Sequence, residues 1–109
     1  MKTKTISELD FDKGNGLIPV VVQEANSLEV LTLAYINKEA LDKTINTGFA
    51  HYYRRSHQKV MKKGVTSGNT QKIVNILTDC DQDSIVYLVN QKGPACHLGE
   101  QTCFHYELK

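Results

Sequence analysis

The sequence has no tryptophan, only two prolines and no long apolar run, and these shortages exclude several classes of protein. A membrane-spanning helix needs about 20 predominantly apolar residues, and a secretion signal needs a shorter apolar core near the N-terminus. Neither pattern is present, so we expect a cytoplasmic protein with no membrane partner. Since repeats and linker-like segments are also absent, the 109 residues predict a single domain, residues 1–109.

Neither sign of charge is in excess. The formal net charge is +1 at pH 7, so we expect no general attraction to nucleic acid, and any anion site must be local. Three cysteines, an odd number, fit a disulfide framework badly in a chain with no export signal. They are therefore either buried free thiols or metal ligands.

Short β-rich runs separated by polar turns dominate the chain, whereas helical periodicity is scarce. Asn37 as a cap and Gly48 as a terminator predict one short helix, near residues 38–46. Strands are predicted at residues 17–23, 29–35, 50–54, 59–62, 71–77, 84–90 and 102–107. Parallel strands need crossovers of a dozen or more residues, so this spacing predicts a β-rich α+β fold of mostly antiparallel short strands.

The segment 79–83 places three carboxylates, Asp79, Asp81 and Asp83, between two predicted strands. Like charges this close repel one another, and a divalent cation that prefers oxygen ligands would offset the repulsion. An EF-hand is excluded, because its glycine and its bidentate acid are replaced by Ser84 and Asn90. A solvated acidic turn is the alternative.

All three thiols, Cys80, Cys96 and Cys103, lie in or beside polar, loop-like stretches. Thiolates bind zinc, and a site with only three protein ligands leaves a fourth position for water, as catalytic zinc requires. The zinc nucleobase deaminases are excluded, because the H-x-E at residues 105–107 follows the cysteine segment instead of preceding it. His97 adjoins Cys96, and an imidazole near a metal can transfer protons at neutral pH.

Two clusters of cations and hydroxyls are candidate phosphate sites. Residues 62–69 combine lysines, hydroxyls and two glycines, but they lack the order of a P-loop. Residues 54–57 form the second cluster, in which an arginine can bind phosphate through two hydrogen bonds. Either cluster can also be a solvated turn.

Taken together, these segments resemble the phosphoribosyl-AMP cyclohydrolase family. Three of the shared motifs, at residues 79–83, 93–97 and 103–104, are highly specific in their order and spacing. The motifs run from about Leu17 to Phe104 and comprise Leu17-Ile18-Pro19, Leu33-Ala34-Tyr35-Ile36-Asn37, Arg55-Ser56, Lys63-Gly64, Thr66-Ser67-Gly68, Gln71, Asp79-Cys80-Asp81-Gln82-Asp83, Gly93-Pro94-Ala95-Cys96-His97 and Cys103-Phe104.

The resemblance implies a monofunctional, metal-bound homodimer that carries out the third step of L-histidine biosynthesis. In that reaction a water activated by zinc attacks C6 of phosphoribosyl-AMP, and the N1–C6 bond opens to give an imidazole carboxamide. Zinc sites built from cysteines of both chains are implied, with His97 as the candidate for proton transfer. The implied ligands are Cys80, Cys96 and Cys103 for zinc and Asp79, Asp81 and Asp83 for magnesium, and the implied substrate contacts are Arg55, Ser56, Lys63, Thr66 and Ser67.

The chain departs from the family pattern at positions near the expected substrate contacts. Arg54 stands where a small residue is usual, Met61 where an aromatic residue is usual, and Val65 where glutamate is usual. Two other functions remain open on the residues alone. One is a non-catalytic module with structural zinc, which would use four protein ligands, and the other is a phosphate-binding regulatory domain.

Overall fold

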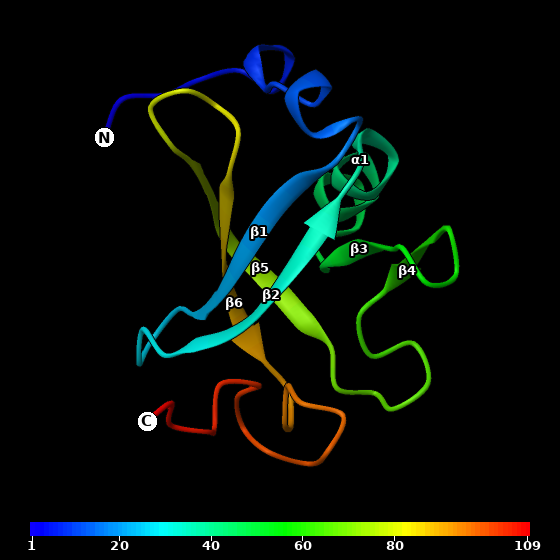
Figure 1. The fold of residues 1–109 in the computed structure, drawn as a ribbon, viewed down its shortest axis with the longest axis vertical. Coiled ribbons are helices and arrows are strands. Elements are labelled where there is room, and N and C mark those ends of the chain that lie inside the picture. The colour runs from blue at the N-terminus through cyan, green and yellow to red at the C-terminus, as the bar shows by residue number, and fades with distance from the viewer.

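The computed structural model describes residues 1–109, which form six strands, one α-helix and two short 3-10 helices (Figure 1). The helix α1 spans Lys38–Thr47, and the 3-10 helices span Ile6–Glu8 and Asp12–Gly14. The strands are β1 (Ile18–Glu24), β2 (Val30–Ile36), β3 (His51–Arg54), β4 (Lys59–Lys62), β5 (Gln71–Thr78) and β6 (Ile85–Gln91). None of the helices is long and apolar enough to cross a membrane.

Four strands form one sheet in the order β2-β1-β6-β5, and β3 and β4 form a separate hairpin. The pairs β1–β2, β5–β6 and β3–β4 are antiparallel, whereas β1 and β6 are parallel. The parallel pair is possible because most of the chain lies between these two strands and serves as the crossover. This arrangement confirms the prediction of a β-rich α+β fold with mostly antiparallel strands.

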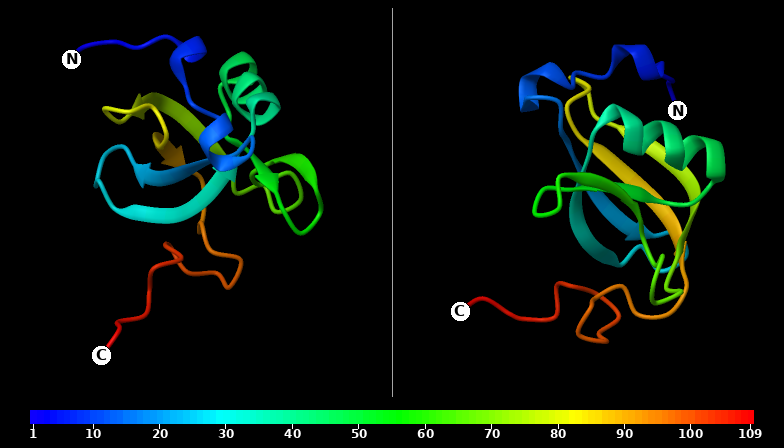
Figure 2. Two further views of the ribbon diagram at one scale, coloured as in Figure 1. Left: turned by 45° about the horizontal axis from the view of Figure 1, so that its top comes forward. Right: turned by 90° about the vertical axis from the view of Figure 1, so that its right-hand side faces the viewer.

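The core lies between the sheet and a second layer made of α1 and the β3–β4 hairpin, which cover the same face (Figure 2). Alternation along β1 turns Ile18, Val20 and Val22 inward, and all three are fully buried. They pack in one cluster with Leu41 of α1 and Tyr52 of β3. The opposite face of the sheet is covered by no element of this chain.

An apolar row crosses that uncovered face. Val21 pairs with Leu33 on one side and with Val86 on the other, and Val86 pairs in turn with Leu77. Leu33 is 51% exposed and Val21 is 36% exposed. An apolar row on an open sheet face is typical of a surface that another molecule covers.

The helix begins and ends where the sequence predicts, within one residue. Asn37 Oδ1 accepts a hydrogen bond from the backbone N–H of Ala40 at 2.8 Å, and Gly48 ends the helix at φ 79°. The prediction of a strand at residues 102–107 is wrong, because these residues form no strand. The start of that segment is bound to β2, through hydrogen bonds from Cys103 N–H to the Leu31 carbonyl at 2.8 Å and from the Thr102 hydroxyl to the Val30 carbonyl at 2.6 Å.

Candidate functional site

A cleft of about 900 Å³ opens beside β2, one of the two edge strands of the sheet. Its walls come from β2, from the β3–β4 hairpin, from the loop after β4 and from the segment after β6. The hairpin and the loop after it are consecutive, whereas β2 and the segment after β6 come from other parts of the sequence. The predicted site residues that the fold gathers in this cleft are Arg55, Ser56, Lys63, Thr66, Ser67, His97 and Cys103.

The cleft is cationic although the whole chain is nearly neutral. Arg54, Arg55, Lys62 and Lys63 line it together with His97, and no aspartate or glutamate does. None of these cations forms an ion pair within the chain. Uncompensated cations in a concave surface attract and concentrate anions. The cleft therefore suits a ligand that carries phosphate groups.

The loop between β4 and β5 closes on itself and is tied to the segment after β6. Gly64 lies so close to Asn69 that a Cβ atom there would be 2.5 Å from the Asn69 carbonyl carbon. The Gly68 N–H donates to the Gly64 carbonyl at 2.8 Å, which leaves Thr66 and Ser67 exposed at the tip. Lys63 Nζ donates to the Ala95 carbonyl at 2.9 Å. The lysine thus joins the loop to the residue that precedes Cys96.

A buried polar network supports the same loop from inside. The Tyr52 hydroxyl donates to Gln71 Oε1 at 2.5 Å, and Gln71 Nε2 donates to Gln91 Oε1 at 2.8 Å. Gln91 Nε2 continues to the Asn69 carbonyl at 3.4 Å. Burial raises the pKa of Tyr52 well above its usual value, so this hydroxyl keeps its proton and remains a donor.

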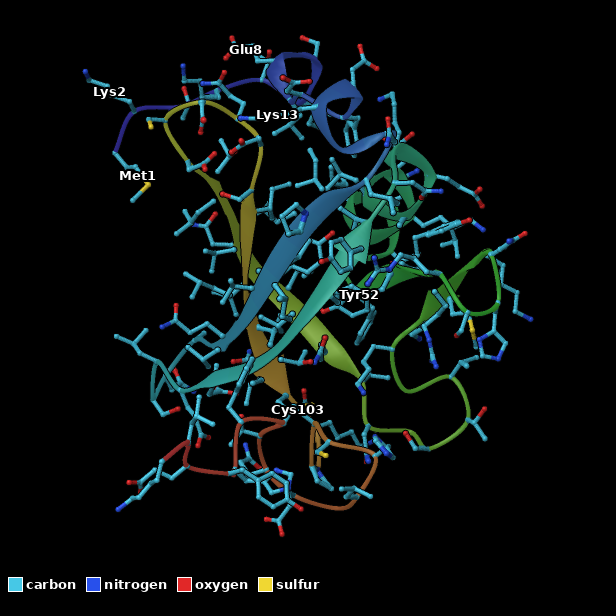
Figure 3. All side chains as sticks on the ribbon, viewed as in Figure 1. Met1, Lys2, Glu8, Lys13, Tyr52 and Cys103 are labelled. Carbon is cyan, nitrogen blue, oxygen red and sulfur yellow. The ribbon has the colours of Figure 1, made fainter.

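The segment after β6 folds back on itself around the Cys96 thiol. The N–H groups of Ala95 and Cys96 donate to the carbonyls of Gln101 and Glu100, at 3.2 and 3.1 Å. Cys96 is 6% exposed, whereas Cys103, farther along the same segment, is exposed. Figure 3 shows Cys103 at the end of the molecule where this segment lies.

The three predicted magnesium ligands come together in a single turn. Their ligand oxygens lie within 4.8 Å of one another, in the turn between β5 and β6. Asp79 accepts hydrogen bonds from the Ser84 hydroxyl at 2.5 Å and from the N–H groups of Asp83 and Ser84, and these bonds lower its pKa to about 2. A carboxylate with such a low pKa stays ionised and available to a cation.

Lys13 already places one positive charge at this turn. Its Nζ lies 2.5 Å from Asp83 Oδ2 and 3.6 Å from Asp81 Oδ2, and hydrogen bonding to Asp83 raises the pKa of Lys13. The carboxyl of Asp81 has its pKa raised, first by its hydrogen bond with Asp83 and further by burial and by repulsion from its neighbours. A positive charge at this turn, such as that of Lys13, reduces the repulsion between the close carboxylates.

One chain does not bring the three cysteines together. Cys80 lies in the β5–β6 turn, while Cys96 and Cys103 follow the opposite end of β6 (Figure 1). A seven-residue strand such as β6 is about 20 Å long, at roughly 3.4 Å per residue. No group of three ligands that includes a cysteine forms within the chain. A zinc site with all three thiols therefore needs a second copy of the protein.

Comparison with known proteins shows which family has these features. The family profile for phosphoribosyl-AMP cyclohydrolase matches residues 32–105, which include every wall of the cleft and the acidic turn. The phosphoribosyl-AMP cyclohydrolase of Nitrosopumilus maritimus is 57% identical over 106 residues, which cover 97% of this chain and 98% of that protein. The chain belongs to the phosphoribosyl-AMP cyclohydrolase family.

Other relatives extend the similarity within this family of hydrolases. The phosphoribosyl-AMP cyclohydrolase of Archaeoglobus fulgidus is 55% identical over 102 residues, 94% of each chain. A histidine biosynthesis bifunctional protein of Pyrococcus furiosus is 50% identical over 105 residues, which cover 96% of this chain and 50% of that protein. These similarities confirm the family resemblance that the motifs predicted.

All three departures from the usual family pattern, Arg54, Met61 and Val65, line the cleft. Tyr35 and Gln71 lie in the family motifs, but the sequence predicted no role for either residue. Tyr35 lies beneath the guanidinium of Arg55, and Gln71 is fully buried in the polar network. The available signal for Gln71 was its place among the family motifs, and that place did not reveal a buried hydrogen-bonding role.

Proposed function

We propose that the chain hydrolyses the purine ring of phosphoribosyl-AMP at the N1–C6 bond, in histidine biosynthesis. One observation carries the proposal: the cationic cleft gathers all five predicted substrate contacts with His97 and Cys103. A substrate with two ribose phosphates needs several cations and hydrogen-bond donors in one concave site, and this cleft offers them. Membership of the phosphoribosyl-AMP cyclohydrolase family supports the same reaction.

Zinc is proposed to be held by Cys96 and Cys103 of one chain and by the partner subunit's Cys80. The thiol chemistry fits zinc, since three thiolates leave a fourth coordination position free for water. The positions of the cysteines also fit, because Cys80 and Cys103 are exposed and lie at opposite ends of the sheet, where a second copy can reach them. Bound in this way, zinc would lower the pKa of its water to about 7 and supply hydroxide at neutral pH.

The protein's own residues bind the substrate and move the proton. Arg55 and Lys63 would neutralise phosphate charge, and the exposed hydroxyls of Ser56, Thr66 and Ser67 would hydrogen-bond phosphate or ribose oxygens. His97 is exposed and lines the cleft, and it would transfer the proton as the N1–C6 bond opens. The substituent at N1 leaves C6 electron-poor, which makes this bond the one that hydrolysis breaks.

Magnesium is proposed at the acidic turn, held by Asp79, Asp81 and Asp83. Oxygen ligands that lie within 4.8 Å of one another are close enough to share one hard cation. Within one chain this turn lies far from the cleft, as Cys80 does. A dimer that brings Cys80 to the partner's cleft would bring the turn there as well, and the cation would then lie near the substrate phosphates.

The homodimer is proposed to use the uncovered face of the sheet. The row formed by Leu33, Val21, Val86 and Leu77 crosses all four strands and supplies an apolar surface that can be buried against a copy of itself. Such an isologous contact is the usual basis of a two-fold dimer.

The direct test is incubation of the purified protein with phosphoribosyl-AMP while the absorbance changes from that of the purine to that of the ring-opened imidazole carboxamide. We expect turnover that a strong chelator abolishes and that added zinc restores. Turnover that persists after verified removal of zinc would contradict the metal chemistry. Binding of the substrate without ring opening would instead support a regulatory domain.

X-ray absorption spectroscopy on the zinc-loaded protein separates the enzyme from a structural zinc module. We expect three sulfur ligands and one oxygen, whereas a structural site would have four protein ligands and no exchangeable water.

A further inference from the structure

The aromatic ring of Tyr35 lies directly beneath the charged end of Arg55. The guanidinium carbon is 4.3 Å from the ring centroid, well inside the range of about 6 Å over which a cation is attracted to an aromatic face. The two residues come from different layers of the fold, Tyr35 from β2 and Arg55 from the turn between β3 and β4. Both line the cationic cleft.

The two partners differ in how firmly they are held. Tyr35 is half-buried on a paired strand, opposite Pro19 of β1 and next to the fully buried Ile36. Arg55 is an exposed residue in a short turn, and a long side chain in such a place samples many rotamers when nothing contacts it. The ring therefore gives the arginine a fixed support that its own turn does not supply.

The stacked geometry leaves the hydrogen-bonding capacity of Arg55 free. No ion pair or side-chain hydrogen bond within the chain engages its guanidinium. Contact with an aromatic ring uses the flat face of the guanidinium and leaves its five N–H donors available at the edge. That edge has the fork geometry that binds a phosphate through two parallel hydrogen bonds.

We propose that Tyr35 is a positioning residue that holds the Arg55 guanidinium ready to bind a substrate phosphate. This inference rests on the proposed function for the identity of the substrate. Its physical basis is preorganisation: an arginine that is already ordered loses less side-chain entropy when the phosphate binds. The tyrosine acts through its ring, because its hydroxyl forms no hydrogen bond within the chain.

The test is a double-mutant cycle on Tyr35 and Arg55, with variants Tyr35→Leu, Arg55→Gln and both together. Two quantities are measured for each protein: kcat and KM for phosphoribosyl-AMP, and the Kd of ribose 5-phosphate by calorimetry. We expect Tyr35→Leu to raise KM and the ribose 5-phosphate Kd about 3-fold to 30-fold, the range of a cation–π contact, with kcat changed less than about 2-fold. In the Arg55→Gln background the same change should have almost no effect.

Two further variants complete the design. Tyr35→Phe keeps the ring and should restore the parent values, while Tyr106→Leu removes an exposed tyrosine outside the cleft and serves as the matched control. Equal effects of Tyr35→Leu in both backgrounds would overturn the proposal, since Tyr35 would then act without Arg55. An effect on phosphoribosyl-AMP but none on ribose 5-phosphate would also overturn it, because Tyr35 would then contact the purine.

Failure of the proposed function gives a different result. A parent protein that binds ribose 5-phosphate but does not open phosphoribosyl-AMP contradicts the reaction, and the cycle on ribose 5-phosphate still decides the role of Tyr35. A parent that binds no ribose 5-phosphate overturns the positioning role as well.

Discussion

Cys96 and His97 are neighbours in the chain, yet their side chains meet different surroundings. Cys96 is buried, whereas His97 is exposed and lines the cleft. If the proposed roles hold, the buried thiol would bind zinc while the exposed imidazole would meet a substrate in the cleft. At the scale of single residues, the proposed metal ligand and the proposed proton-transfer group can therefore be tested by separate substitutions.

The first prediction concerns His97→Gln. Loss of the proton-transfer group should lower kcat by about 10²–10⁴-fold and change the pH–rate profile, while zinc content and thermal stability stay close to those of the parent. Steady-state kinetics across neutral pH, metal analysis and a melting curve provide the measurements. A kcat within a few-fold of the parent would assign the proton transfer to another group.

The second prediction concerns Tyr52→Phe. Removing the hydroxyl leaves the buried Gln71 oxygen without its 2.5 Å partner, which should lower the free energy of unfolding by about 1–3 kcal/mol at pH 8. The pKa of Tyr52 is raised by burial above its unfolded value of about 10, so the hydroxyl stabilises the fold fully below pH 10 and loses this effect as the pH rises further.

Denaturant unfolding at pH 8 and pH 11 measures both effects. The difference between parent and Tyr52→Phe should be smaller at pH 11. Tyr106→Phe is the control, because Tyr106 is 82% exposed and its hydroxyl has no partner within the chain. If the difference in unfolding free energy between parent and Tyr52→Phe is the same at both pH values, Tyr52 is not the group that titrates.

At the scale of elements, the loop between β4 and β5 depends on two glycines for different reasons. Gly64 and Gly68 have nearly equal positive φ angles, 81° and 80°. An added Cβ at Gly64 would meet the backbone of Asn69 and Thr70 at 2.5–2.7 Å, whereas nothing lies within 4 Å of one at Gly68. Only Gly64 therefore combines backbone strain with a steric clash.

The third prediction compares Gly64→Ala with Gly68→Ala. Both should lose about 1–2 kcal/mol of stability from the left-handed conformation, and Gly64→Ala should lose more, because the loop must move. Since the displaced loop carries Lys63, Thr66 and Ser67, Gly64→Ala should also raise KM for phosphoribosyl-AMP more than Gly68→Ala does. Unfolding curves and kinetics on both variants provide the test. Equal unfolding free energies and equal KM values for the two variants would show that the close approach of Gly64 to Asn69 is unimportant.

The segment at residues 102–107 shows where strand prediction fails at this scale. The segment contains β-favouring residues, and its first residues do bind β2, through Cys103 and Thr102. Phe104 and Tyr106 are then exposed, and no strand lies beside them. Without a neighbouring strand to pair with, β-propensity alone does not form a strand.

At the scale of the whole molecule, the position of Cys80 at the far end of β6 from Cys96 leads to the fourth prediction. Cys80→Ala and Cys103→Ala should each lose zinc and activity. When the two inactive proteins are mixed, unfolded and refolded together, each mixed dimer should contain one intact zinc site. Random pairing in a two-fold dimer then restores about one quarter of the parent activity.

The matched control is a mixture of Cys96→Ala with Cys103→Ala. In the proposed site, Cys96 and Cys103 come from the same chain. Every zinc site in a mixed dimer of these two variants therefore lacks one thiol, and no activity should return. Activity assays and zinc analysis of the refolded mixtures distinguish the two cases. Absence of recovery in the mixture of Cys80→Ala with Cys103→Ala would contradict a site shared between chains.

The fifth prediction tests the uncovered sheet face. Val21→Asp places a charge in the centre of the apolar row, which a single folded chain tolerates but a buried dimer contact does not. Sedimentation and zinc analysis should show a folded monomer that has lost its metal. Ile45→Asp is the control, since Ile45 is 43% exposed on α1, on the other side of the sheet. An unchanged dimer in Val21→Asp would place the interface elsewhere.

The sequence by itself determined the features that depend on near neighbours. Asn37 and Gly48 set the ends of α1 through local hydrogen bonds and backbone conformation, and the turn residues predicted most strand boundaries to within about two residues. The spacing of the cysteine and aspartate motifs was also sufficient to identify the family, because that information lies in residue order and needs no coordinates.

Only the tertiary structure decided what joins distant segments. The parallel pairing of β1 with β6, the contact between Tyr35 and Arg55 and the bond from Lys63 to Ala95 each link residues at least 20 positions apart. Such contacts form because burial of the whole apolar face of the sheet selects one arrangement of the chain, a choice that no short segment contains. The same selection separates Cys80 from Cys96 and Cys103, so strand geometry, not residue order, requires a second copy for a zinc site with all three thiols.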